Sequence, residues 1–303
     1  MRVISRICVT ALLAVMAIAG SGAAWAGYGQ PTPWQLGFQG SVTPVMDDIV
    51  WFHNDFLLWI ITAISAFVLV LLLMVIVRFN ARSHPTPSRT THNTLLEIAW
   101  TAIPVIVLLC IAIPSFKLLF FQLNTPPADL TVKATGKQWF WSYSYPDNGK
   151  FEYDSLMLKD DERQARLAKD AKADVPRLLA VDNELVVPVN KVVRVLVTGA
   201  DVIHSWSVPS FGVKIDAVPG RINETWFKAT REGMYYGQCS QLCGRDHAFM
   251  PIAVRVVSQQ EFQAWLADAK KKYASEDSPA TVAVAKSGQD KSTKDTPVAV
   301  AAK

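Results

Sequence analysis

The sequence predicts a membrane-anchored protein in which a two-helix transmembrane hairpin precedes an all-β domain. Three observations predict this architecture. Half of the 303 residues are hydrophobic, too many for an ordinary soluble domain and too few for membrane spans alone. Two long apolar runs stand in the first half of the chain. Beyond them, short stretches alternate apolar and polar residues, as strands do.

Residues 1–26 have the pattern of a secretory signal peptide. Basic residues precede an apolar stretch, and Ala24 and Ala26 form an A-x-A-like cleavage site. We expect cleavage after Ala26, and the alternative is a retained N-terminal anchor. Cleavage would leave three of the four cysteines, Cys110, Cys239 and Cys243, an odd number that does not fit a disulfide framework.

Residues 27–124 are predicted to form an exported segment and the hairpin. Phe56–Val77 has no charged residue and is long enough to cross a bilayer as a helix. Ile98–Phe121 carries only Lys117, which can reach the headgroups, and two prolines that indicate a kink. Between the runs, Arg78–Thr94 holds arginines and no acid, whereas Gly27–Asp55 holds aspartates and no Lys or Arg. The positive-inside rule therefore places the loop in the cytoplasm and both chain ends outside.

Residues 125–273 are predicted to fold as an all-β sandwich or barrel. Stretches such as LTVKATGKQWFWSYSY are aromatic-rich and alternating, and Gly, Pro and Asn turns separate them. The charged segment Lys159–Arg177 is expected to be a partly helical surface insertion. Ser258 and Glu261 form a capping-box pattern at the start of a closing helix. The low-complexity tail, 274–303, is expected to be disordered.

One short segment gathers four potential metal ligands. Cys239 and Cys243 are four positions apart, His247 follows four positions later, and Met250 comes three after that. His204 is the other histidine within the predicted β domain, and it stands at the edge of a predicted strand. Two thiols, two imidazoles and a thioether are the donor types that bind transition metals.

Four kinds of site can be built from these residues. A disulfide between Cys239 and Cys243 suits an oxidising compartment, but its loop is very short and it ignores His247 and Met250. A zinc site with two Cys and two His fits the count, although the spacing is irregular and Met is a poor zinc ligand. A mononuclear blue-copper centre leaves one Cys over. A copper pair bridged by both thiolates uses every candidate, and we favour it.

At these residues the sequence closely resembles subunit II of the haem–copper cytochrome c oxidases. The motifs that carry the resemblance are CSQLCGRDHAFMP, DVIHSW, DAVPGR and KATGKQWFWSYSY, and it covers roughly Gln35–Tyr273. It implies a cupredoxin-like Greek-key β-barrel or sandwich that holds the dinuclear Cu-A centre, with two copper ions bridged by the cysteines. The implied ligands are His204, Cys239, the backbone carbonyl of Gln241, Cys243, His247 and Met250.

Gln241 departs from the family pattern, which usually has Glu at this position. Its backbone carbonyl can still reach copper. The Glu side chain of the family, however, helps to hold magnesium at the interface with subunit I, and a neutral amide oxygen is a weaker ligand for that hard cation. The sequence therefore argues against magnesium in this chain.

The resemblance also implies functions for residues beyond the copper ligands. Trp139 would lie exposed over Cu-A and receive electrons from cytochrome c, whereas composition alone favours an aromatic core strand. Asp201 and Asp216 match acidic positions that dock basic cytochrome c, and the alternative is that both are turn residues. Glu97 would stand at the mouth of the proton path into subunit I, and the simpler alternative is an interfacial carboxylate.

The predicted function is electron input to a respiratory oxidase. Electrons from cytochrome c would pass through Cu-A to haem in subunit I, where oxygen becomes water and protons are pumped. Expected partners are subunits I and III, cytochrome c and the lipid of the bacterial inner membrane, with the β domain in the periplasm and no nucleic acid. Two alternatives remain: a copper-free quinol-oxidase subunit II, which the two thiols oppose, and a membrane-anchored copper-binding or delivery module.

Overall fold

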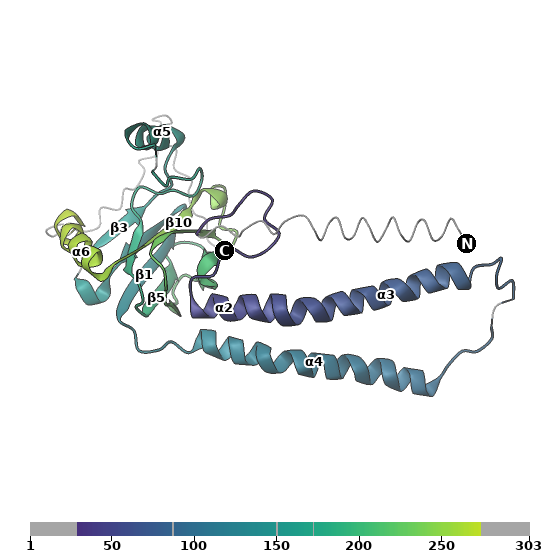
Figure 1. Cartoon of the computed structure of the whole chain (residues 1–303). Coiled ribbons are helices and arrows are strands. Elements are labelled where there is room, and N and C mark those ends of the chain that lie inside the picture. The colour runs from purple at the N-terminus through teal and green to yellow at the C-terminus, as the bar shows by residue number, and fades with distance from the viewer. Residues whose placement is uncertain (1–28, 87, 150, 172, 274–303) are drawn as a thin grey trace, which may run out of the picture.

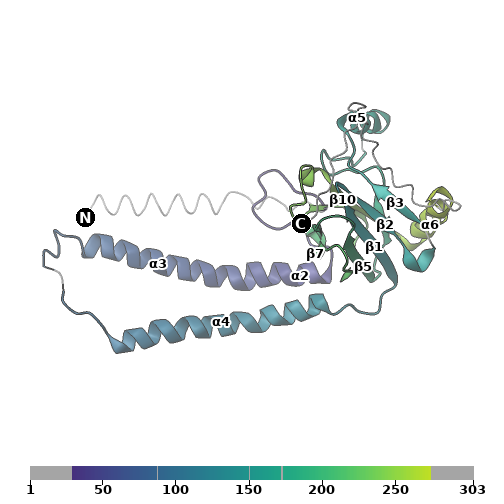
Figure 2. The same cartoon turned by 180° about the vertical axis from the view of Figure 1, so that it is seen from behind.

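The computed structural model describes residues 29–86, 88–149, 151–171 and 173–273. The predicted signal peptide at 1–26 and the predicted tail at 274–303 lie outside these residues. Two long helices leave one side of a β domain and run alongside each other (Figure 1). The view from behind shows the same arrangement, with two further short helices on other sides of the β domain (Figure 2).

The first membrane helix begins twelve residues before the apolar run that predicts it. It consists of α2 (Pro44–Trp51), a π-helical turn (Phe52–Leu57) and α3 (Leu58–Arg78). Thr43 caps its first turn, because the Thr43 hydroxyl accepts a hydrogen bond from the Met46 N–H at 3.1 Å. The same hydroxyl donates to the Phe211 carbonyl at 2.8 Å, which joins the helix to the β domain. The predicted span is therefore only the membrane-crossing part of a longer helix.

The second membrane helix, α4 (Thr94–Leu123), contains the whole of the second predicted span. Asn93 caps it by accepting a hydrogen bond from the Leu96 N–H at 3.1 Å. Both long helices are apolar enough to cross a membrane, and α3 and α4 have no buried residue. Apolar surface of this extent needs lipid or other membrane helices around it.

The β domain consists of two five-stranded sheets. The strands are β1 (Leu130–Lys137), β2 (Phe140–Ser144), β3 (Glu152–Ser155), β4 (Leu185–Pro188), β5 (Val193–Gly199), β6 (His204–Val208), β7 (Val213–Ala217), β8 (Asn223–Phe227), β9 (Gly233–Cys239) and β10 (Pro251–Val257). One sheet has the order β3-β2-β1-β5-β8 and the other β4-β10-β9-β6-β7. The β1–β5 and β4–β10 pairs are parallel, and the remaining pairs are antiparallel. The predicted all-β sandwich is confirmed.

The aromatic stretch that reads as one alternating run is a hairpin. β1 and β2 pair in antiparallel register with Lys137 opposite Phe140, so Gln138 and Trp139 form the turn between them. The run has no Gly, Pro or Asn at this point to mark the turn. The patterns also did not indicate β3 and β7, which are short and carry several exposed polar side chains.

Large aromatic side chains fill the space between the sheets and make the scaffold rigid. Trp141, Tyr143 and Trp206 are fully buried. The polar tips are mostly satisfied: Trp206 Nε1 donates to the Tyr143 hydroxyl at 3.4 Å, and the Tyr145 hydroxyl donates to the Val186 carbonyl at 2.7 Å. This core fixes the ends of the strands that carry the candidate ligands.

Two helices lie outside the sandwich. α5 (Asp160–Lys169) belongs to the charged insertion, as its composition predicts. α6 (Gln259–Tyr273) closes the domain, and Ser258 and Glu261 form the predicted capping box. In it the Glu261 N–H donates to the Ser258 hydroxyl and the Ser258 N–H donates to the Glu261 carboxylate, both at 3.2 Å.

Candidate metal centre

Strand pairing brings the candidate ligands together at one end of the sandwich. His204 is the first residue of β6 and Cys239 is the last residue of β9. These strands are antiparallel neighbours with Trp206 opposite Cys239. The Ser240 N–H donates to the Ser205 carbonyl at 3.0 Å, which continues the pairing past the end of β9. Two residues 35 positions apart are thereby placed next to each other.

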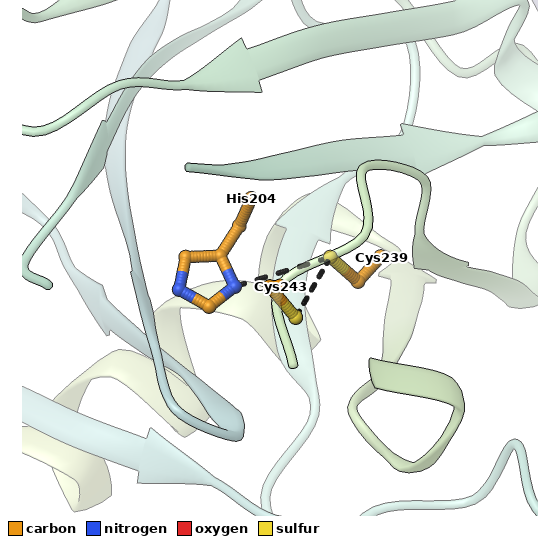
Figure 3. Close-up of side chains that lie close together, drawn as sticks. All are labelled: His204, Cys239 and Cys243. Atoms are coloured by element: carbon orange, nitrogen blue, oxygen red, sulfur yellow. Dashed lines mark hydrogen bonds between the residues drawn. The ribbon is translucent and has the colours of Figure 1, made fainter. Parts of the chain in front are cut away.

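Three potential ligand atoms form a compact group. The Cys239 Sγ lies 3.9 Å from the Cys243 Sγ and 3.9 Å from the His204 Nδ1 (Figure 3). The ligand atoms of the three residues all lie within 4.8 Å of one another, and all three residues are buried. Cys239 and Cys243 are both free. The separation is far from the roughly 2.05 Å of a disulfide, so the two sulfurs are available to a metal.

The remaining predicted ligands surround the same two sulfurs. The Cys243 Sγ lies 3.5 Å from the His247 Nδ1 and 3.5 Å from the Met250 Sδ. The Gln241 carbonyl oxygen lies 3.4 Å from the Cys239 Sγ. Met250 is buried immediately before β10, whereas His247 is half-buried in a short turn of 3₁₀ helix. The structure thus brings all six predicted ligand groups to one place.

The imidazole of His204 is held from several sides. Its Nε2 lies 2.8 Å from the Asp201 Oδ1, so its Nδ1 faces Cys239. The Trp141 ring meets it edge-on with ring centroids 6.0 Å apart. A Cβ on Gly136 would lie only 2.8 Å from the His204 Cδ2 and 2.9 Å from its Cγ. Only glycine at position 136 therefore leaves room for this ring.

Electrostatics couples His204 to its two neighbours. Burial disfavours the charged imidazole, but hydrogen bonds with Cys239 and Asp201 outweigh burial and raise the pKa of His204. Burial likewise opposes the charge of Asp201, yet hydrogen bonds from His204 and from two backbone N–H groups lower the pKa of that carboxyl. Asp201 is therefore ionised, and a carboxylate can only accept hydrogen bonds from the ring.

The two thiols differ in acidity. Burial raises the pKa of a thiol, but for Cys239 hydrogen bonds with His204 and with the backbone at Gln241 and Ser205 outweigh burial, and the pKa falls. For Cys243, burial and the neighbouring negative charge of Cys239 both raise the pKa. Cys239 therefore ionises first. A bound cation is the natural way to stabilise both thiolates together, because metal-coordinated thiols are deprotonated.

Trp139 lies against the loop that carries Cys243. Its side chain is half-buried, and the indole N–H donates to the Cys243 carbonyl at 3.3 Å. A Cβ on Gly244 would lie 3.0 Å from the Trp139 ring. The guanidinium of Arg245 stands 5.4 Å from the ring centroid and pairs with Asp246 at 2.9 Å. The indole therefore contacts the ligand loop directly.

The other two predicted functional carboxylates lie away from the cluster. Asp216 is exposed on β7, where it is paired across the sheet with Ser205. Glu97 is half-buried in the first turn of α4, and its carboxylate accepts a hydrogen bond from the Asn93 N–H at 3.3 Å. It lines an open hollow on the surface of α4 together with Thr94 and Thr101. In the described part of the chain, no hydrogen bond or ion pair joins either carboxylate to a candidate ligand.

One residue of the site, Gln138, was missed by the sequence reasoning. Its side-chain amide donates to the Cys243 carbonyl at 2.9 Å. The available signal was its position beside Trp139 in the aromatic motif. Sequence alone does not show that the two residues form a turn, and only a turn places both side chains over the ligand loop.

The donor set suits copper. It comprises two cysteine sulfurs, two imidazole nitrogens, a thioether and a backbone carbonyl. Soft thiolate and thioether ligands select copper over hard cations such as magnesium and calcium. A four-coordinate zinc site of two Cys and two His would leave the thioether of Met250 without a function, although it lies 3.5 Å from the Cys243 sulfur.

Comparisons with known proteins agree with this arrangement. The family model described as "Cytochrome C oxidase subunit II, periplasmic domain" matches residues 130–257, and the one described as "Cytochrome C oxidase subunit II, transmembrane domain" matches 31–118. A Rickettsia bellii protein named "Probable cytochrome c oxidase subunit 2" is 52% identical over 242 residues, 80% of this chain and 87% of that protein. The chain belongs to the cytochrome c oxidase subunit II family.

Further relatives carry the same name. Cytochrome c oxidase subunit 2 of Cereibacter sphaeroides is 48% identical over 252 residues, which cover 80% of this chain and 82% of that protein. The chain is also similar to the periplasmic domain of subunit II of cytochrome oxidase from Bradyrhizobium japonicum, known from a crystal structure. The two sequences are 66% identical over a match that covers 50% of this chain and 99% of that domain, with a TM-score of 0.44. As a subunit II, the chain is a component of cytochrome c oxidase with a membrane hairpin and a periplasmic β domain.

Proposed function

We propose that this subunit II is the electron-input component of the oxidase and that its β domain holds a dinuclear Cu-A centre. The observation that supports the proposal most strongly is the meeting of two free thiols at 3.9 Å. An imidazole Nδ1 faces each sulfur, His204 towards Cys239 and His247 towards Cys243. No other part of the described chain groups His, Cys, Asp or Glu ligand atoms in this way.

Six groups of the chain would hold the metal pair: His204, Cys239, the Gln241 carbonyl, Cys243, His247 and Met250. Bound copper would supply a one-electron reservoir shared by two ions. The protein's contribution is rigidity. Strand ends and a filled aromatic core keep the donors in nearly one arrangement in both redox states, which limits the rearrangement that accompanies each electron transfer.

The position of Trp139 supports an electron path through this residue. Its ring lies between solvent and the Cys243 loop, where a docked cytochrome c could approach it. Electrons would then go to haem in subunit I, where oxygen is reduced to water and protons are pumped. Exposed carboxylates such as Asp216 would attract basic cytochrome c from a distance.

The membrane part supports the remaining assignments. The bare apolar surfaces of α3 and α4 would contact subunit I, subunit III and the lipid of the bacterial inner membrane. Glu97 would stand at the mouth of the proton path into subunit I, on the opposite end of α4 from the β domain. The copper-free quinol-oxidase alternative gives no function to the buried thiol pair, and the copper-delivery alternative gives none to Trp139 or Glu97.

The proposal is tested in the purified oxidase with two matched cysteine variants. Cys243→Ser removes a sulfur from the site, whereas Cys110→Ser changes an exposed cysteine within α4. We expect reduced cytochrome c to bleach the copper absorption rapidly in the wild type and in Cys110→Ser, at a rate that falls as salt is raised. In Cys243→Ser the copper absorption and cytochrome c oxidation should both be lost. Unimpaired oxidation by Cys243→Ser would overturn the proposal.

A further inference from the structure

A closed set of hydrogen bonds surrounds the candidate ligands and passes through Asp201. Its Oδ1 accepts from the His204 Nε2 at 2.8 Å and from the Val202 N–H at 2.6 Å. Its Oδ2 accepts from the backbone N–H of Gln138 at 2.7 Å. One carboxylate thus connects a ligand imidazole on β6 with the β1–β2 turn, 63 positions earlier in the chain.

Two further hydrogen bonds hold the same turn against the loop that carries Cys243. The Gln138 Nε2 donates to the Cys243 carbonyl at 2.9 Å, and the Trp139 Nε1 donates to the same oxygen at 3.3 Å. A carbonyl oxygen has two lone pairs, and these two donors occupy both. Gln138 therefore contacts Asp201 through its backbone and the ligand loop through its side chain.

We propose that Asp201 is a positioning residue of the metal site and that Gln138 positions the turn that carries Trp139. Asp201 holds the proton of His204 on Nε2, so that the Nδ1 lone pair faces Cys239, and it fixes the turn that carries Trp139. Gln138 fastens that turn to the Cys243 loop. This inference rests on the proposed function, in which Trp139 receives the electrons from cytochrome c.

This differs from the docking function that the sequence suggested for Asp201. The residue is exposed and 34% of its side chain is accessible, but three donors already surround its carboxylate within 2.8 Å. The Asp216 carboxylate is exposed, and no hydrogen bond to it is found among the described residues. Asp216 is thus free to act on a partner at a distance, whereas Asp201 acts inside the site.

The first test compares Asp201→Asn, in the loop before β6, with Asp216→Asn, on β7; each removes one negative charge. Copper affinity is measured by chelator competition on the full-length chain in detergent. Asp201→Asn should lower it by about 10–100-fold, as losses of partners behind metal-bound histidines do. The reason is that an Asn amide cannot accept from both the imidazole and the Gln138 N–H. Asp216→Asn should keep wild-type affinity and change only the salt dependence of cytochrome c oxidation.

A second test needs no metal. The Gln138 N–H is held by Asp201, so its hydrogen exchange in the metal-free chain should be faster in Asp201→Asn than in Asp216→Asn. Gln138→Ala keeps the Asp201–His204 bond and loses the bond to the Cys243 carbonyl. It should keep copper affinity and the copper spectrum while slowing cytochrome c oxidation.

The inference is overturned if Asp201→Asn and Asp216→Asn show equal copper affinity and equal exchange at Gln138. It is also overturned for Gln138 if Gln138→Ala oxidises cytochrome c at the wild-type rate. Failure of the proposed function is a separate result, seen in the wild type as binding of a single metal ion. In that case the same comparison is made with that ion: a lower affinity in Asp201→Asn than in Asp216→Asn still supports a positioning function for Asp201.

Discussion

The indole N–H of Trp139 donates to the backbone carbonyl of Cys243 at 3.3 Å. The side chain proposed to receive electrons is therefore in direct contact with the loop that carries one of the two sulfurs proposed to bridge the coppers. Trp139 and Cys243 are 104 positions apart in the chain. Their contact exists because the β1–β2 turn and the loop after β9 meet at one end of the sandwich.

Trp139→Ala should slow cytochrome c oxidation without changing the copper spectrum. Trp139 is not one of the proposed metal ligands, so its replacement should leave the metal site in place. The proposed contact with cytochrome c is lost. A decrease of about tenfold or more in kcat/KM is expected, as for the tryptophans that dominate protein interfaces. Phe140→Ala is the control, because Phe140 is the next residue and its ring lies under Lys137 instead. Wild-type turnover in Trp139→Ala would remove this residue from the path.

Gly136→Ala should impair metal binding through a purely steric effect. The new methyl group would lie 2.8 Å from the His204 Cδ2, so the imidazole must move away from its bonds to Asp201 and Cys239. We expect copper affinity to fall, together with a loss of about 1–3 kcal/mol in stability from overpacking. Gly37→Ala is the matched control, since a methyl group there meets nothing within 4 Å. Equal copper affinity in both variants would show that the His204 ring is not confined as described.

Thr43→Ala should loosen the joint between the membrane helix and the β domain. The change removes the cap on α2 and leaves the Phe211 carbonyl without its donor. A loss of about 2 kcal/mol in the free energy of unfolding is expected from the cap and the unsatisfied carbonyl together. Urea unfolding of the full-length chain, followed by tryptophan fluorescence, measures this. Thr43→Ser retains the hydroxyl and should be near wild type, and an equal loss in both variants would contradict the assignment.

Gln241→Glu should increase divalent-metal binding in the assembled oxidase without disturbing copper. The proposed copper ligand at this position is the backbone carbonyl, which the substitution keeps, and the exposed side chain gains the charge that hard cations prefer. Manganese bound per oxidase, counted by paramagnetic resonance after loading, tests this expectation. Equal manganese binding in wild type and Gln241→Glu would show that the side chain does not reach a cation.

Much of the architecture could be predicted from local sequence features. The two apolar runs indicated the hairpin because a bilayer-spanning helix needs about 20 apolar residues. The spacing of Cys239, Cys243, His247 and Met250 indicated a metal loop because these donor types rarely gather without one. Both signals lie within short windows of the chain. Composition could not show where the first helix begins, because the Thr43 cap and α2 depend on contacts with the β domain.

The parts of the site that sequence did not reveal depend on contacts between distant residues. The Gln138–Asp201 bond joins positions 63 apart, and the Gln138–Cys243 bond joins positions 105 apart. Nothing in the residues next to Gln138 or Asp201 indicates these bonds. The sequence therefore suggested only a docking function for Asp201 and no function for Gln138. Both bonds form because Gln138 and Trp139 make a turn. The sequence shows only an alternating aromatic run at this point, which does not indicate a turn.

The most direct test of the account is the number of copper ions in the native oxidase's subunit II. Metal analysis is combined with paramagnetic resonance of the oxidised protein. We expect two copper ions per chain and a spectrum in which one unpaired electron is shared by both nuclei. A single metal ion per chain, or a native bond between the sulfurs of Cys239 and Cys243, would contradict it.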